Sequence, residues 1–224
     1  LAHDIRRMEA AYLETNKRQL EVKKNFSMAD LASEQLLELK LSGRTLLDIR
    51  EWMYNLDYPG HYRRRIKSVG MTVIADTGEY TNINCSLRLM NSEIRTSGVL
   101  GEEGYERVTD DRRFISVAGT GESIATSHCK YDNGLFTLKF DDDRFLPFEG
   151  CGAISTWDIH MPQENNQFDF ESISNIILHI NYTAQDGGDV LADPARTRLD
   201  GILSGSKTLL VGLHYLFPEE WIDF

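Results

Sequence analysis

The sequence lacks any hydrophobic run long enough to cross a membrane. No stretch approaches the roughly 18 consecutive apolar residues that a transmembrane helix needs, and the longest candidate, Leu209 to Leu213, is no longer than a buried strand. The chain opens on Leu rather than Met, and no secretory signal pattern follows. We therefore expect the 224 residues to begin inside a longer polypeptide.

Cysteine and positive charge are both scarce. The three cysteines, Cys85, Cys129 and Cys151, are too few and too scattered for a disulfide framework, and none lies in a Cys-x-x-Cys metal spacing. Lys and Arg number 24 against 35 Asp and Glu, which gives a formal net charge of −11. This acidity argues against generic binding to nucleic acid or to an anionic membrane surface, because both depend on cationic side chains.

Familiar catalytic motifs are absent too. The sequence contains no His-Glu-x-x-His, no Gly-x-Ser-x-Gly and no dinucleotide-binding Gly-x-Gly-x-x-Gly. The segment 201–208 is similar to a phosphate-binding loop, but Ser206 separates its last glycine from the lysine, and a helix precedes it where a strand is required. The acidic run 141–143 favours a solvated turn over a calcium site. We predict no enzymatic activity, no metal and no cofactor.

The first 55 residues are expected to form a helical lead. Over 3–26, residues step by three and four positions, which is typical of a heptad seam, and polar Thr15 and Gln19 weaken its middle. Such a stripe packs against other helices, of this chain or of absent partners; alternatively the segment is an ordinary surface helix. The helix-packing candidates are Ile5, Met8, Tyr12 and Val22.

Two further short helices are predicted inside this lead. Ser27 and Thr45 each begin a pattern that resembles a capping box, which favours helices over about 30–41 and 46–54. Gly43 lies where a C-terminal cap glycine belongs. A turn at 58–60 then marks a change of period.

Residues 56–224 are predicted to form an antiparallel β-sandwich. Apolar residues alternate with polar ones in several short runs, whereas parallel strands would be apolar on both faces. One helix interrupts the strands at about 189–203. The fold class is therefore mainly β, with a helical segment before the sandwich and one helix inserted near the C-terminus. The six stripes are Val69/Met71/Val73, Ile83/Cys85/Leu87/Leu89, Phe136/Leu138/Phe140, Trp157/Ile159/Met161, Ile176/Leu178/Ile180/Tyr182 and Leu209/Val211/Leu213/Tyr215.

Two local clusters are candidates for binding a partner. The first surrounds the turn at 58–60 and is either an edge strand protected by charge or a contact surface, since Tyr and Arg are enriched at interface hot spots. Its candidate residues are Tyr58, His61, Tyr62, Arg63, Arg64, Arg65 and Lys67. The second, 144–150, contributes Phe145 and Phe148 and is either a buried corner of the sandwich or a second contact surface.

These clusters also carry a resemblance to a known family. The segment 56–69, LDYPGHYRRRIKSV, resembles the D-F-P-G-H-Y-x-R-R-I-K-S-V signature near the C-terminus of A components of bacterial insecticidal toxin complexes (Tc toxins). Further matches follow in the same order at 94–97, 145–157, 167–170, 176–184 and 217–221. The chain departs from the pattern at Tyr58, at the extra Arg63 and at Cys151.

The resemblance implies a non-enzymatic assembly role. In that family, the A component is a large secreted subunit that forms a homopentameric translocation channel. Its C-terminal β-rich domain docks the B component, whose β-propeller gate closes a cocoon that the B and C components form around a cytotoxic enzyme. The lead helix would correspond to the end of a channel helix. The implied partners are therefore the B component and further copies of the A component, with no nucleic acid and no direct membrane contact.

Two alternatives stay open. The aromatic residues and carboxylates on a β scaffold also fit a carbohydrate-binding or glycan-cleaving module, which would need an exposed Trp or Tyr beside paired carboxylates. Trp157 lies on an apolar stripe, so we expect it to be buried and unable to stack on a sugar. The second alternative is that the chain is an isolated relative of the family that acts outside a toxin complex.

Overall fold

The computed structural model describes residues 2–15, 18–77, 81–101, 104–118, 122–128, 135–139 and 146–205. Within these stretches the helices are α1 (Ala2–Thr15), α2 (Met28–Leu31), α3 (Ser33–Ser42), α4 (Glu51–Asn55) and α5 (Asp189–Leu203), with 3-10 turns η1 (Gln163–Asn165) and η2 (Phe170–Ser172). The strands are β1 (Leu20–Ser27), β2 (Arg44–Ile49), β3 (His61–Ala75), β4 (Asn82–Arg95), β5 (Phe114–Ala118), β6 (Glu122–His128), β7 (Leu135–Lys139), β8 (Ile154–His160) and β9 (Ile173–Asp186).

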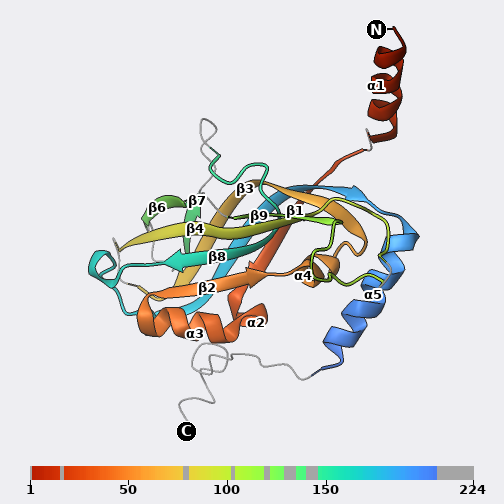
Figure 1. Ribbon diagram of the computed structural model, residues 1–224. Coiled ribbons are helices and arrows are strands. Elements are labelled where there is room, and N and C mark those ends of the chain that lie inside the picture. Colours follow the sequence, from red (N-terminus) through yellow and green to blue (C-terminus); the bar gives the residue numbers. More distant parts are fainter. Residues whose placement is uncertain are drawn as a thin grey trace.

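The strands form two antiparallel sheets (Figure 1). The first, sheet A, has the order β1-β9-β3-β7, and its long central strands β3 and β9 pair from His61–Asp186 to Ala75–Ile173. The second, sheet B, has the order β2-β8-β4-β5, and β6 also pairs with β4. The two sheets share one hydrophobic core, so the predicted mainly β, antiparallel sandwich is confirmed.

The core lies between the sheets and follows the predicted alternation. Each fully buried aliphatic or aromatic side chain contributes about 1.5–3 kcal/mol relative to exposure, so this double layer supplies the main stabilising term. Trp157 is completely buried, as predicted. Phe140 and the stripe at 209–215 lie outside the described residues. The confirmed stripes, with every side chain at most 1% exposed, are Val69/Met71/Val73, Ile83/Cys85/Leu87/Leu89, Phe136/Leu138, Trp157/Ile159/Met161 and Ile176/Leu178/Ile180/Tyr182.

Short helices cover the ends of the sandwich. α2 contacts β9 and α3 contacts β2, while α4 packs against α5 at the other end (Figure 1). The backbone N–H of Asp30 donates to Ser27 Oγ, so the predicted cap at Ser27 is confirmed. Gly43 ends α3 in the left-handed conformation (φ 72°), where a side chain would be strained. The helix predicted at 189–203 is confirmed as α5.

The helix predicted over 3–26 is too long. It ends at Thr15, and Leu20–Ser27 form strand β1, which pairs with β9. Val22 and Phe26 are four residues apart, a spacing that places them on one face of a helix and also on one face of a strand. Pairing with β9 selects the strand. In that strand Val22, Lys24 and Phe26 face the core, and the residues between them face outward.

The helix predicted over 46–54 is also wrong in its first half. Arg44–Ile49 form β2 in sheet B, and only Glu51–Asn55 are helical, as α4. Thr45 is a buried strand residue rather than a helix cap. The segment 1–55 therefore supplies one strand to each sheet, and the division of the chain at residue 55 stays a prediction.

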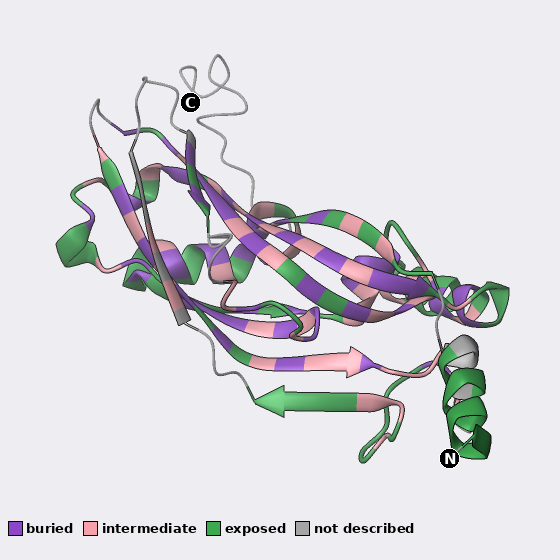
Figure 2. Ribbon diagram, turned by 90° about the horizontal axis from the view of Figure 1, so that it is seen from above, coloured by how far each residue is buried: buried purple, intermediate pink, exposed green. Residues whose placement is uncertain are grey.

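α1 projects away from the sandwich, and Figure 2 shows it exposed over its described side chains. None of the helices in the stretches described above is both long and apolar enough to span a membrane.

Candidate functional site

The turn at 56–60 is held firmly against α5. Gly60 has φ 81°, and a Cβ at this position would lie 2.6 Å from the Cα of Ala192, so only glycine fits. Its carbonyl accepts a hydrogen bond from the N–H of Gly187, in the connection between β9 and α5. The first candidate cluster, residues 58–67, therefore begins at a fixed point of the fold.

A β-bulge then separates the three consecutive arginines. The register between β3 and β9 shifts between Tyr62 and Arg65, and Arg63 takes a left-handed conformation with φ 49°. Side chains that would alternate regularly along a strand are redirected, so Arg63, Arg64 and Arg65 reach three different environments.

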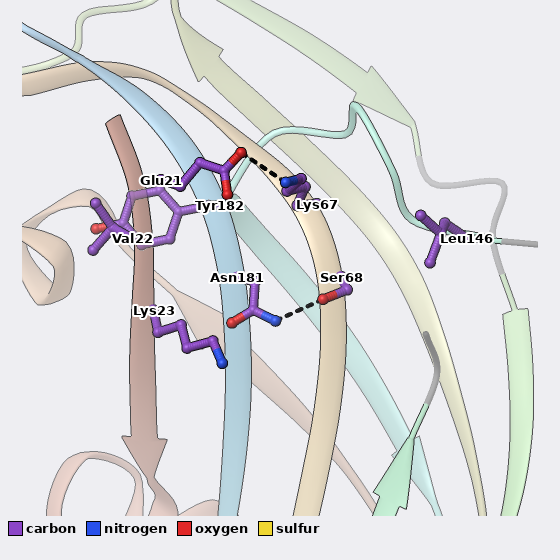
Figure 3. Close-up of a pocket in the computed structure, with 8 residues that line it drawn as sticks. All are labelled: Glu21, Val22, Lys23, Lys67, Ser68, Leu146, Asn181 and Tyr182. Atoms are coloured by element: carbon purple, nitrogen blue, oxygen red, sulfur yellow. Dashed lines mark hydrogen bonds and ion pairs between the residues drawn. The ribbon is translucent and has the colours of Figure 1, made fainter. Parts of the chain in front are cut away.

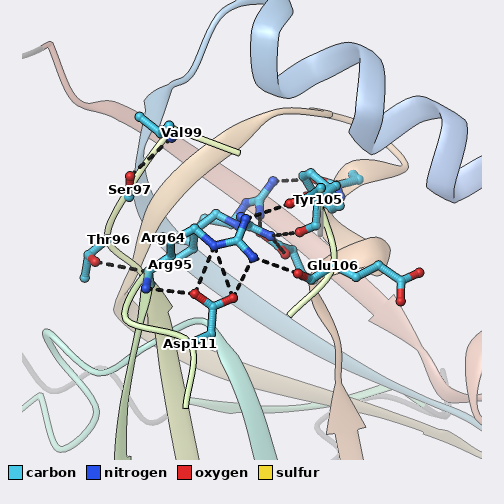
Figure 4. Close-up of polar contacts among 12 residues, drawn as sticks. Arg64, Arg95, Thr96, Ser97, Val99, Tyr105, Glu106 and Asp111 are labelled. Atoms are coloured by element: carbon cyan, nitrogen blue, oxygen red, sulfur yellow. Dashed lines mark hydrogen bonds and ion pairs between the residues drawn. The ribbon is translucent and has the colours of Figure 1, made fainter. Parts of the chain in front are cut away.

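Arg64 is buried and belongs to an internal network (Figure 4). Its Nη2 donates to Asn55 Oδ1 at 2.7 Å and to the carbonyl of Tyr58 at 3.2 Å, and its Nη1 lies 3.4 Å from Glu51 Oε1. Only 3% of this residue is exposed. Arg64 therefore braces the turn from inside and offers no side chain to a partner, which corrects its assignment as a contact residue.

Arg95 joins the same carboxylate from sheet B. Its Nε and Nη2 donate to the two oxygens of Glu51 at 2.8 and 2.9 Å, and Nη2 also donates to the carbonyl of Tyr105 at 2.7 Å. The guanidinium lies 4.5 Å from the ring centroids of both Tyr105 and Phe114. Two buried guanidinium groups thus share the one carboxylate of Glu51, and the network ties α4, β3, β4 and the loop at 104–113 together.

Tyr58 and His61 lie together at the end of the sandwich, and Arg63, two residues further along, contacts Thr96. The rings of Tyr58 and His61 stack with centroids 5.3 Å apart, and 43% of Tyr58 is exposed. Partial burial, and secondarily the Arg64 charge, lower the pKa of His61 below 6.5, while Asp186 opposes the shift. Arg63 Nε donates to the carbonyl of Thr96 at 3.1 Å. These three residues remain available as a contact surface.

Arg65 and Lys67 lie on the outward face of sheet A. Arg65 pairs with Thr183, which pairs in turn with Glu21, and residues paired across strands share a face. Lys67 Nζ donates to Glu21 Oε1 at 2.7 Å. These two predicted contact residues are thus exposed, but on a different surface from Tyr58 and His61.

A shallow groove of about 490 Å³ runs along this outward face (Figure 3). Its polar lining comes from three strands, and Asn181 Nδ2 donates to Ser68 Oγ at 2.7 Å in its floor. Neither Lys23 nor Asn181 was predicted as a site residue: Lys23 falls in the helix expected over 3–26, and Asn181 lies on the polar face of a strand that was predicted correctly. Glu21, Lys23 and Asn25 alternate with Val22 and Phe26, but Lys24 interrupts the apolar side of the pattern, so the strand that carries Lys23 has no clear local signal.

Of the remaining aromatic candidates, the two that the structure describes, Tyr62 and Phe148, are buried. Tyr62 is 5% exposed and packs in a small second cluster with Tyr105, Leu191 and Ala195. Phe148 is buried with its ring edge-on to Trp157, centroids 4.9 Å apart, so the second cluster is a buried corner at this residue. Phe145 lies outside the described residues.

The four helix-packing candidates lie on two different elements, α1 and β1. Ile5, Met8 and Tyr12 lie on α1 and are 55%, 73% and 63% exposed. Val22 belongs to β1 and packs against the core of the sandwich, so its assignment to a helix seam is wrong.

In the part of the chain that the structure describes, no group of three or more His, Cys, Asp or Glu side chains is arranged to hold a metal ion. The acidic run 141–143 lies outside that part. Burial raises the pKa of the Cys85 thiol to about 12, which keeps it protonated and unreactive at neutral pH.

Comparison with known proteins identifies the family. The domain family described as "Tc toxin complex TcA C-terminal TcB-binding domain" matches residues 1–184. The chain belongs to this family. It is also 32% identical over 208 residues to the toxin subunit YenA2 of Yersinia entomophaga, a match that covers 88% of this chain and 15% of YenA2. The resemblance to Tc toxin A components inferred from the sequence motifs is thereby confirmed.

Two solved structures were also matched to this Tc toxin domain. The cryo-EM structure of TcaA–TcaB from Yersinia pseudotuberculosis is 20% identical with a TM-score of 0.43, and the match covers 83% of this chain and 11% of that one. The structure of Mud crab tombus-like virus is 8% identical with a TM-score of 0.35, covering 83% and 88%. Both TM-scores are below 0.5, and neither likeness bears on fold or function.

Proposed function

We propose that this chain docks the B component of a Tc toxin, together with C, onto a translocation channel that the A component forms as a homopentamer. The observation that carries the proposal is the match of residues 1–184 to a family of TcB-binding domains. Assembly rather than catalysis is the role, and the parent protein acts as a secreted toxin subunit. The chain spans about 15% of the length of YenA2, so the channel would be formed by the remainder of the parent protein.

α1 would be the end of a helix of that channel. Its exposed residues Ile5, Met8 and Tyr12 are one heptad-like stripe, and a short isolated helix with such a stripe is marginal in water. Packing against equivalent helices of neighbouring subunits would cover it. Val22 takes no part in this proposal, because it packs in the sandwich core.

The exposed members of the 58–67 cluster would contact the B component. Tyr58 and His61 stack on each other, Arg63 donates to the Thr96 carbonyl, and Arg65 and Lys67 lie on the outward face of sheet A. Tyr and Arg are the residue types that most often dominate binding energy at interfaces. The network of Arg64, Arg95 and Glu51 would support this surface from beneath.

The test is binding of the B–C complex to the full-length A component that carries this chain, measured by biolayer interferometry. The double variant Tyr58→Ala/Arg63→Ala should weaken the affinity about tenfold or more, as expected for hot-spot residues. The matched control Leu46→Ala/Arg50→Ala removes an exposed apolar and an exposed cationic side chain elsewhere, and should change the affinity less than twofold. Absence of binding by the wild-type protein would refute the proposed function.

A further inference from the structure

The outward face of sheet A carries an excess of positive charge. The strand register places Glu21, Thr183 and Arg65 in one row, then Lys23, Asn181 and Ser68, then Asn25, His179, Gly70 and Lys139. Lys67 is the extra residue of a second bulge and reaches Glu21 on the same side. The three rows and this bulge thus hold four cations and one carboxylate, in a chain whose net charge is −11.

Most of this charge is not neutralised locally. Lys67 pairs with Glu21, whereas Lys23, Arg65 and Lys139 make no ion pair with any residue in the described stretches. Elsewhere in those stretches Arg44, Arg95, Arg107 and Arg113 each have a carboxylate partner. The outward face therefore holds three cations without a carboxylate partner in the described stretches, beside one cation that has such a partner.

The arrangement of the face is rigid and open. His179 bridges two strands, with Nδ1 2.8 Å from Asn25 Oδ1 and Nε2 2.8 Å from Thr72 Oγ1. Its pKa is lowered by burial and then by the nearby Lys23, which agrees with a positive local potential. α2 contacts this face at Asn175, whose side-chain oxygen accepts a hydrogen bond from the N–H of Ala29. The groove of about 490 Å³ lies between Lys23 and Lys67 (Figure 3).

We infer that this outward face binds an acidic surface of a folded protein partner, which, if the proposed function holds, is the B component. Lys23 stands on β1, Arg65 and Lys67 on β3 and Lys139 on β7, and β9 lies between β1 and β3. Because each strand lies about 5 Å from the next, the cations are spread across the face and suit discrete carboxylates held on a second protein. Complementary charge of this kind mainly raises the association rate and fixes orientation. An anionic lipid surface fits less well, because the whole chain is acidic and would be repelled at long range.

The experiment measures the association rate of the B–C complex with the full-length A component at 50 mM and 500 mM NaCl. For the wild-type protein the rate should fall about tenfold or more at the higher salt. The double variant Lys23→Glu/Lys67→Glu should associate about tenfold more slowly at low salt and show a weaker salt dependence. Glu21→Gln, which removes the opposing carboxylate, should associate faster than the wild type.

A matched control separates local from global charge. Arg50→Glu/Arg196→Glu changes the net charge by the same amount at two exposed positions off this face, and its rate should stay within about threefold of the wild type. The neutral pair Lys23→Gln/Lys67→Gln, with circular dichroism to confirm folding, gives an intermediate rate if charge is the cause. Equal slowing by the face and control variants would overturn the inference.

The outcomes also separate this inference from the proposed function. No binding of B–C by the wild type refutes the proposed function itself. Binding whose rate is indifferent to salt and to the Lys23/Lys67 variants leaves docking intact and refutes the acidic-partner inference alone. Co-sedimentation of the wild type with phosphatidylserine vesicles, lost in Lys23→Glu/Lys67→Glu while the B–C rate is unchanged, would assign the face to a lipid surface instead.

Discussion

Arginine and lysine residues that lie within a few residues of each other on β3 have opposite surroundings. Arg64 is buried beside Arg95, and both guanidinium groups share the carboxylate of Glu51. Arg65 and Lys67 are exposed on the outward face of sheet A. The bulge after Tyr62 creates this difference, and it decides which cations hold the fold together and which can meet a partner.

The difference predicts that equal chemical changes will have very different costs. A buried charge that loses its partner keeps its desolvation penalty, whereas an exposed charge is solvated by water instead. The following variants test that comparison, from the largest expected effect to the smallest.

Glu51→Gln should lower the free energy of unfolding by about 3–5 kcal/mol, because two buried guanidinium groups lose their only carboxylate in the described stretches. Urea denaturation followed by tryptophan fluorescence measures this. The matched control Glu21→Gln breaks the exposed pair with Lys67 and should cost less than about 1 kcal/mol. Similar costs for the two variants would contradict the distinction between the two groups.

Arg64→Met should cost about 1–3 kcal/mol, since it leaves Asn55 Oδ1 and the Tyr58 carbonyl without their donor while Arg95 still neutralises Glu51. Arg65→Met, one residue along, should stay within about 0.5 kcal/mol. Comparison of the two urea midpoints checks this. If Arg65→Met lost stability and Arg64→Met did not, the assignment of Arg64 as the buried arginine would be contradicted.

Gly152→Ala tests the backbone frame around the bulge. The segment 151–153 bridges β3, through bonds to Arg64 and Ile66, and a Cβ on Gly152 would lie 2.2 Å from the carbonyl oxygen of Glu93 in β4. We expect a cost of about 1–3 kcal/mol in the same assay. Gly201→Ala, in α5 with open space around it, should instead stabilise the protein by up to about 1 kcal/mol.

His61 should give the smallest effect, a dependence on pH. The pKa of His61 in the folded protein is below 6.5, so the unfolded chain binds a proton at this residue more readily. The stability of the fold at this residue is therefore fully present above about pH 6.5 and is lost as the pH falls through the folded pKa. His61→Gln should therefore lose less stability than the wild type between pH 7.5 and pH 5. A steeper loss in the variant would show that the shift has the opposite sign.

The sandwich was predictable from sequence because its strongest strands depend on a local pattern. Residues 83–89 and 178–182 alternate strictly between apolar and polar side chains, and no helix shares that period. β1 was not predictable in this way, since Val22 and Phe26 fit either period and only pairing with β9, some 150 residues away, selects the strand. Thr45 likewise resembles a helix cap until β8 pairs with its strand.

The candidate site was predicted less well than the fold. Sequence identified the 58–67 cluster but could not assign its three arginines, because a bulge depends on the register between β3 and β9. Glu51 and Arg95 carry no local signal of their connection, since 44 residues separate them and one lies in helix α4 while the other ends strand β4. Lys23 and Lys139 join the outward face through strands at opposite edges of sheet A.

The position of β1 has a mechanical consequence. β1 follows α1, pairs within the described stretches with β9 alone, and has its first residue, Leu20, opposite Ala184 near the end of β9 that leads into α5. A pulling force between α1 and α5 would therefore separate β1 from β9 one residue pair at a time, starting at Leu20 and Ala184. A pull between α1 and the opposite end of the sheet would load all eight pairs in shear, so the sandwich should resist force far better in one direction than in the other.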